Sequence, residues 1–183
     1  MAETLLIRLA PDANSIRDWV LVDAQGQARS PVQTGAPGAG VINAPPRTIV
    51  LVPGIDVFLG DARVPGRNRQ QVLRAIPYAL EEQLATDVEQ LHFALGPVQA
   101  DNHYPVAAVD REKMESWAEL LREHGINANQ WLPEMLALPA AEEGWSLLVD
   151  QETVLVRTGP YAGFASDSDA ATGFPAIISC GAL

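Results

Sequence analysis

The sequence predicts a mixed α/β fold, in which helices flank a mixed β-sheet. Short apolar segments with the two-residue period of strands recur along the 183 residues, and two longer segments have the period of amphipathic helices. Their order is strands, a helix, two strands, a second helix, a strand and a hairpin, which is typical of a sheet with helices on its faces. The hydrophobic content of 48% is enough for one sizeable core or two small lobes.

Four strands are expected before the first helix. Residues 4–9 and 19–22 are apolar and are separated by turn-forming residues, so they predict an antiparallel hairpin. Residues 25–46 are rich in Gly, Ala, Pro and Ser and bury too little to order themselves, so we expect a mobile surface loop inside the domain. Residues 48–52 and 56–64 then predict two further strands.

The first helix is expected to begin near Asn68. Pro77 has no backbone N–H and crowds the preceding turn, so we expect two helical pieces, the second beginning at the proline. Glu81, Glu82 and Asp87 are placed on the exposed side of this helix. Its buried side is expected to carry five apolar residues: Val72, Leu73, Ile76, Leu80 and Leu84.

Two strands and a second helix follow. Residues 90–95 and 104–109 predict strands joined by a turn at 101–102. Asp110 is a favourable N-cap for the helix, and Gly125 is a favourable terminator. The packed face of this helix is expected to consist of Met114, Trp117, Leu120, Leu121 and His124.

The remaining residues predict mainly strands. A short strand is expected to begin at 126–128, and prolines limit residues 132–139 to a turn or two of helix. Residues 145–150 and 153–158 predict a hairpin that residues 162–165 extend. An apolar strand is expected to begin at the very end of the chain, at Ile177.

Composition excludes several classes of partner. The net charge of −11, from 12 basic and 23 acidic side chains, argues against nucleic acid and anionic lipid, and suits either simple solubility or a basic protein partner. The lone cysteine, Cys180, cannot form an internal disulfide and indicates a reducing compartment. No apolar run approaches the roughly 20 residues that cross a bilayer.

Two segments carry a resemblance to a known family. Residues 76–96 read IPYALEEQLATDVEQLHFALG, and residues 51–57 read Leu-Val-Pro-Gly-x-Asp-Val, followed by Val-Pro-x-x-x-Arg. Both segments resemble the cytoplasmic part of protein L of bacterial type II secretion systems, with Ile76 where the family has Leu. The resemblance is specific over about 50 residues and architectural elsewhere.

The resemblance implies an actin-like, ribonuclease H-like fold at the cytoplasmic face of the bacterial inner membrane. Residues 1–145 would form the first lobe, which includes the loop at 25–46. Residues 146–183 would form the opening hairpin of a second, truncated lobe, because the family continues through that lobe, a membrane helix and a periplasmic domain. Membrane association would then occur only through a C-terminal segment that this chain lacks.

Catalysis is not expected, and we predict no cofactor or metal site. Actin-like enzymes bind ATP phosphates with two Asp-x-Gly turns, whereas residues 9–14 and 150–152 have no glycine where those turns need it. There is no Gly-x-x-x-x-Gly-Lys-Ser/Thr loop and no Gly-x-Ser-x-Gly motif. His92 and His103 fall on different strands, and Asp150 with Glu152 is interpreted as a solvated pair on a hairpin.

The resemblance therefore implies a non-catalytic scaffold that recruits the secretion ATPase, protein E, with platform proteins M and F as further partners and a homodimer as its assembly. Complementary charge would orient a basic partner, so our candidate partner-binding residues are Glu81, Glu82, Asp87 and Glu89. Two alternatives stay open. One is a nucleotide-binding adaptor of type IV pilus assembly, the protein M type, and the other is a kinase-like enzyme of the same fold.

Overall fold

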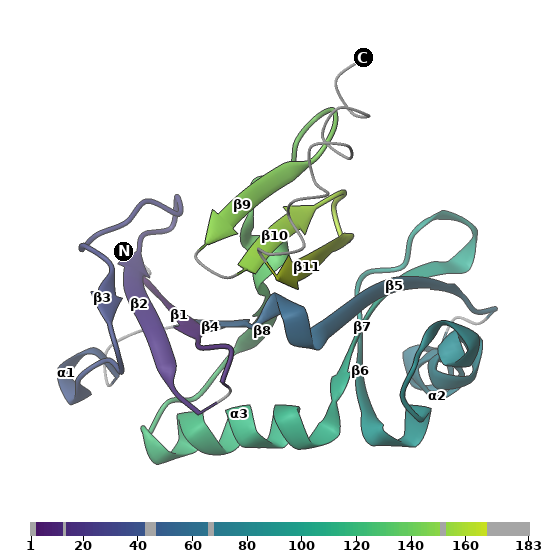
Figure 1. Cartoon of the computed structure of the whole chain (residues 1–183), viewed down its shortest axis with the longest axis horizontal. Helices are drawn as coiled ribbons and strands as arrows, with labels where there is room; N and C mark the ends of the chain where they lie inside the picture. The colour runs from purple at the N-terminus through teal and green to yellow at the C-terminus, as the bar shows by residue number, and fades with distance from the viewer. Residues whose placement is uncertain (1–2, 13, 43–46, 66–67, 151–152, 168–183) are drawn as a thin grey trace.

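The computed structural model describes residues 3–12, 14–42, 47–65, 68–150 and 153–167. These residues form three β-sheets with one long helix below them and a second helix at one side (Figure 1). No helix in the described part of the chain combines the length and hydropathy that crossing a bilayer requires.

The first sheet is mixed and has five strands in the order β3-β2-β1-β4-β8. Strand β1 pairs antiparallel with β2 and parallel with β4, which pairs parallel with β8. In this register Ile7 of β1 lies between Trp19 of β2 and Val50 of β4. The strands, in chain order, are β1 Thr4–Leu9, β2 Ile16–Val22, β3 Gln33–Thr34, β4 Arg47–Val52 and β8 Gln130–Pro133.

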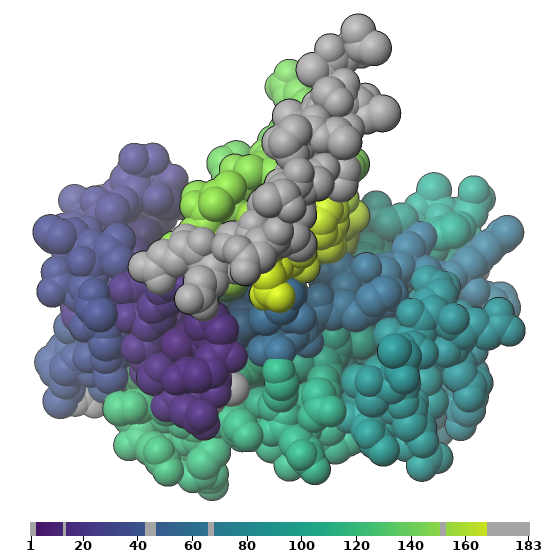
Figure 2. Space-filling model, viewed as in Figure 1, coloured from purple at the N-terminus to yellow at the C-terminus, as the bar shows by residue number. Residues whose placement is uncertain are grey.

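The other two sheets are antiparallel and have three strands each, in the orders β5-β7-β6 and β11-β10-β9. The second sheet contains β5 Val57–Arg63, β6 Leu91–Leu95 and β7 His103–Asp110. The third contains β9 Ser146–Asp150, β10 Thr153–Arg157 and β11 Gly163–Asp167. In Figure 2 the green and yellow surface of this third sheet stands above the purple and blue surface of the first strands.

Among the described residues, three α-helices and five 3-10 turns connect the strands. The α-helices are α1 Ala39–Ile42, α2 Arg69–Leu80 and α3 Arg111–Glu123. The 3-10 turns are η1 Gly54–Asp56, η2 Glu81–Gln83, η3 Val88–Gln90, η4 Ala100–Asn102 and η5 Glu134–Ala137.

Each long helix buries one face against the strands. Trp117 of α3 is fully buried and packs in one cluster with Ile7 and Val50 of the first sheet. Ile76 of α2 is fully buried in a separate cluster with Val106 of β7. The amphipathic period of both segments therefore predicts most of each packed face, because one side of each helix is buried and the other is exposed.

Most predicted elements are confirmed. The hairpin at 4–9 and 19–22 forms, with the second strand beginning earlier, at Ile16. The turn at 101–102 forms with positive φ at both residues. Asp110 caps α3 by accepting hydrogen bonds from two backbone N–H groups, and Gly125 adopts a φ of 68° just after the helix.

The predicted break of the first helix at Pro77 is wrong. Helix α2 is continuous from its N-cap Asn68 to Leu80, with Pro77 inside it. A proline inside a helix costs roughly 3 kcal/mol, whereas full burial of Ile76 and Leu80 contributes roughly 1.5–3 kcal/mol each. Packing on both sides of the proline therefore offsets the cost.

Several side chains and boundaries also differ from expectation. Leu73 and His124 were assigned to packed helix faces, but both are exposed. The strand expected at 126–128 forms later, as β8, because Asn129 first holds the Thr48 backbone N–H through its side chain at 2.6 Å. The expected start of a strand at Ile177 lies outside the described residues.

The Gly- and Pro-rich segment at 25–46 contains more structure than expected. It includes β3, which pairs with β2, and α1. Val41 and Ile42 of α1 pack against the main core cluster. These two apolar side chains attach the segment to the core, although its average composition is poor in residues that can be buried. The mobility of the segment stays a prediction.

Candidate partner-binding surface and buried ion-pair network

The four acidic residues expected to bind a partner lie on two 3-10 turns that follow α2. Glu81 and Glu82 form the start of η2, so they do not belong to a longer α-helix as predicted. Asp87 caps η3, where its carboxylate accepts a hydrogen bond from the Glu89 backbone N–H at 3.0 Å. All four side chains are exposed.

The carboxylates on the two turns differ in how close they lie to positively charged side chains. In the part of the chain that the structure describes, none of these four carboxylates forms an ion pair. Glu89 nevertheless lines a hollow together with Arg74 and Arg111, whose positive charges offset its own. Glu81 and Glu82, adjacent on η2, are therefore the more available pair for a basic partner.

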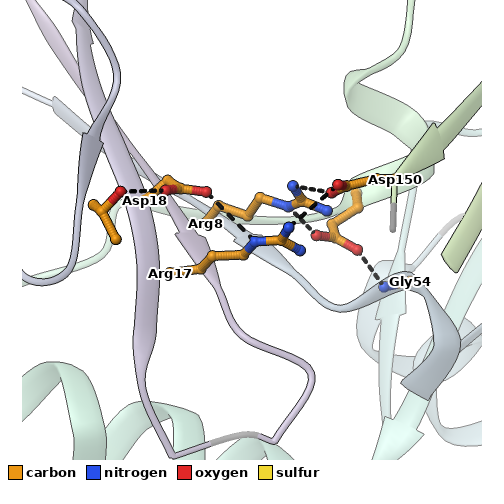
Figure 3. A network of polar contacts seen from close by, with 7 residues as sticks. Arg8, Arg17, Asp18, Gly54 and Asp150 are labelled. Atoms are coloured by element: carbon orange, nitrogen blue, oxygen red, sulfur yellow. Dashed lines mark hydrogen bonds and ion pairs between the residues drawn. The ribbon is translucent and has the colours of Figure 1, made fainter. Parts of the chain in front are cut away.

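A second group of charged residues, of which the sequence singled out only Asp150, joins the first and third sheets. Figure 3 shows Arg8 of β1 and Arg17 of β2 directed toward Asp150 of β9. Arg8 contacts Asp150 at 2.6 Å and Glu134 of η5 at 2.5 Å. Arg17 contacts Asp150 at 3.2 Å and Asp18 at 3.6 Å. We call Arg8, Arg17, Glu134 and Asp150 the ion-pair network.

The network is shielded from water. The side chains of Arg8 and Asp150 are each 20% exposed, and that of Glu134 is 7% exposed. Burial alone would raise the pKa of Asp150, but the hydrogen bond and charge of Arg8, together with Arg17, outweigh it and hold the pKa below its usual value. Burial likewise opposes the charge of Arg8, yet Glu134 and Asp150 together raise its pKa. Each charge therefore depends on its partners.

Apolar packing surrounds the same junction. The free oxygen of Glu134 accepts a hydrogen bond from the Gly54 backbone N–H at 3.0 Å, at the end of β4. A Cβ atom on Gly54 would approach Met135, Leu155 and Ala165 to 3.1 Å each. Gly54 thus lets the backbone lie close to η5 and the third sheet, and a larger residue would require these three side chains to shift.

Two members of the ion-pair network are neighbours in the chain of the sites where the Asp-x-Gly turns were sought. Asp150 ends β9 directly before the second turn, and the first turn follows β1. The expectation that Asp150 is solvated is wrong, because it contacts two arginines that lie more than 130 positions away in the chain. Glu152, its expected companion, lies outside the described residues.

The histidines do not come together. His103 contacts Asp61 across the β5–β7 pair at 2.6 Å, whereas His92 lies on β6 and His124 follows α3. Within the described residues, no group of three or more His, Cys, Asp and Glu side chains is placed to hold a metal ion.

Comparison with known proteins decides the family. A sequence model of the family described as type II secretion system (T2SS), protein L, matches residues 5–175. The chain belongs to the protein L family. Among curated relatives, protein L of Dickeya chrysanthemi is 30% identical over 176 residues, which cover 91% of this chain and 43% of the relative. Protein L of Klebsiella pneumoniae is 33% identical over 170 residues, covering 91% and 42%.

Solved structures agree with this membership in the protein L family. The cytoplasmic domain of EpsL, an inner membrane component of the type II secretion system of Vibrio cholerae, matches with a TM-score of 0.79 and 25% identity, over 96% of this chain and 75% of that one. The chain thus spans less than half the length of the curated protein L relatives and most of a solved cytoplasmic domain.

More distant structures show the fold alone. A Bacteroides thetaiotaomicron protein with an actin-like ATPase fold matches with a TM-score of 0.52 and 9% identity, over 97% of this chain and 76% of that one. A chain of the PilM–PilN type IV pilus biogenesis complex matches with a TM-score of 0.56 and 14% identity, over 96% and 66%. The predicted mixed α/β, actin-like fold of this protein L family member is confirmed.

Proposed function

We propose that this chain is a non-catalytic scaffold of the type II secretion inner-membrane platform and that it recruits the cytoplasmic secretion ATPase, protein E. Membership of the protein L family supports a role in type II secretion. The observation that carries the recruitment proposal is the adjacent, exposed and unpaired glutamates Glu81 and Glu82 on η2. They present negative charge on a turn that α2 holds in place.

Charge would act mainly on the formation of the complex. Exposed carboxylates attract and orient a basic partner surface, and the effect weakens as salt screens the charges. The net charge of −11 adds a long-range attraction of the same sign. Recruitment by this surface should therefore be faster at low ionic strength.

The ion-pair network supports the non-catalytic part of the proposal. In an actin-like enzyme, the carboxylates at the two hairpins face the nucleotide phosphates and the metal-bound water. Here Asp150 contacts the guanidinium groups of Arg8 and Arg17, and Arg8 also contacts Glu134. A triphosphate would have to displace these contacts to enter.

Other parts of the assembly are proposed on family membership alone. Proteins M and F of the platform are the further partners, and a homodimer is the expected state. A part of the protein outside this chain would attach it to the inner membrane. This chain would then act at the cytoplasmic face of that membrane.

Charge reversal tests the recruitment proposal. The double variant Glu81→Lys/Glu82→Lys should bind the amino-terminal domain of protein E about tenfold more weakly, because rim charges contribute on the order of 1 kcal/mol to association. Its melting temperature should stay the same, since both side chains are exposed. Calorimetric titration of the purified chains gives the affinity.

A matched control is available on the loop before β9. Glu142→Lys/Glu143→Lys makes the same change of charge at two adjacent exposed residues outside the proposed surface. This control should bind protein E as the unchanged chain does. Equal loss in both double variants would show that only net charge matters, and equal affinity in all three chains would remove the acidic surface from the proposal.

A further inference from the structure

The two segments that carry the family resemblance are distant in the chain but line one pocket. Residues 55–58 approach it from η1 and β5, and residues 83–86 approach it from the turn after α2. The ends of β7 and the start of α3 complete the wall, and the hollow has a volume of about 480 Å³. This pocket takes no part in the ion-pair network.

A buried carboxylate with an unsatisfied oxygen lines the pocket. The side chain of Asp56 is 9% exposed, and its Oδ1 accepts a hydrogen bond from Lys113 Nζ. Its Oδ2 is buried and has no hydrogen-bond partner among the described residues. Because a buried carboxylate oxygen without a donor is unfavourable, a further donor group at this oxygen would stabilise it.

The charges in the pocket do not balance. Asp56 and Asp110 contribute two carboxylates, and Lys113 contributes one ammonium group. Asp110 uses its Oδ1 to cap α3, at 2.8 Å from the Glu112 backbone N–H. The pocket therefore retains net negative charge, which a cation from outside would neutralise.

We propose that this pocket receives a lysine or arginine side chain from a basic segment of the recruited ATPase. The proposal rests on the proposed function and adds the specific point of attachment. The donor group of the incoming residue would bind Asp56, and its aliphatic stem would lie on Ile55 and Leu84. Ile55 is 45% exposed and Leu84 is half-buried, so both offer apolar surface for such a stem.

The surroundings favour this occupant. Glu81 and Glu82 directly precede the lining segment 83–86, and Asp87 directly follows it. A basic segment attracted by these exposed charges would thus reach the pocket without moving to another part of the surface. An acidic or purely apolar occupant would leave Asp56 Oδ2 without a donor and the net negative charge of the pocket uncompensated.

Filling the pocket gives the sharpest test. Ala85 is exposed and lines the hollow, so Ala85→Trp would obstruct it without disturbing the core. The variant should bind the amino-terminal domain of protein E at least tenfold more weakly, with an unchanged melting temperature. Ala140→Trp, at an exposed alanine on another loop, is the matched control and should bind normally.

A second variant tests the charge. Asp56→Asn keeps the shape of the side chain and removes its charge, so it should also weaken binding and reduce the dependence of affinity on salt. Unchanged affinity in Ala85→Trp would overturn the proposal. Loss in Glu81→Lys/Glu82→Lys without loss in Ala85→Trp would overturn the pocket alone, whereas absence of binding by the unchanged chain would overturn recruitment itself.

Discussion

At the scale of single residues, Arg8 links elements that are far apart in the chain. Its guanidinium contacts Glu134 and Asp150, which belong to η5 and β9. A bidentate or forked arrangement suits arginine, because its planar group presents several N–H donors in fixed directions. Lysine at this position would offer one compact charge and could not hold both carboxylates equally well.

Removing one carboxylate should show what the ion-pair network contributes. We expect Asp150→Asn to lower the free energy of unfolding by about 1–3 kcal/mol at pH 7. The substitution leaves the positive charges of Arg8 and Arg17 largely shielded from water and removes a negative charge that balances them. Glu119→Ala breaks the Arg122 pair, whose side chains are 72% and 51% exposed, and should cost less than 1 kcal/mol. Urea unfolding measures both, and equal losses would contradict the shielding.

The same variant makes a prediction about pH. The pKa of Asp150 is lowered in the folded chain, so its contribution is fully present above the usual value of 3.8 and is lost as the pH falls through the lower folded value. The stability difference between the unchanged chain and Asp150→Asn should therefore stay constant from pH 7 to about pH 5 and disappear in stronger acid. If the stability difference between the two chains disappeared near pH 6, the pH dependence would come from a titratable group other than Asp150.

At the scale of elements, α2 shows how packing overrides local preference. Proline at position 77 predicts a break, yet the helix continues because Ile76 and Leu80 fill the space against β5 and β7. The helix ends only where Leu80 has been buried and the glutamates of η2 begin. The acidic surface is therefore positioned by the end of a packed helix.

Two leucines on this helix separate core from surface. Leu80 is fully buried, so Leu80→Ala should destabilise the chain by about 2–5 kcal/mol. Leu73 is 41% exposed, so Leu73→Ala should cost less than 1 kcal/mol. Thermal and urea unfolding compare the two, and a larger loss for Leu73 would mean that the helix is rotated relative to its sheet.

At the scale of the whole molecule, the third sheet is joined to the first by one compact junction. The junction combines the ion-pair network with the close approach at Gly54. An actin-like enzyme needs the corresponding space for phosphate and metal. This arrangement supports the scaffold that we propose, whereas the nucleotide-binding adaptor and the kinase-like enzyme remain the alternatives to test.

Nucleotide binding separates these alternatives directly. Calorimetric titration of the chain with Mg-ATP should give no heat of binding at micromolar concentrations, since Asp150 already pairs with Arg8 and Arg17, and Arg8 also pairs with Glu134. Clear micromolar affinity would contradict the scaffold reading and favour the adaptor. The variant Asp150→Asn, which frees one side of the junction, shows whether the network itself excludes the nucleotide.

Much of the fold could be predicted because its signals are local. The alternation of Leu91, Phe93 and Leu95 predicts β6, and the cap at Asp110 predicts the start of α3. The exposure of Glu81 and Glu82 can be predicted because charged side chains are rarely buried. Local patterns cannot give the ion-pair network, because nothing near Arg8 in the chain indicates Asp150 as its partner.

The sequence by itself determined the mixed α/β class, most of the strand and helix order, and the residues that carry the family resemblance. Period, capping and residue identity act within a few positions and can be read along the chain. Only the tertiary structure decided that α2 passes through Pro77, that Asp150 faces two arginines, and that residues 55–58 and 83–86 share one pocket. Those outcomes depend on which distant residues are packed together, and packing free energy outweighs local preference where the two disagree.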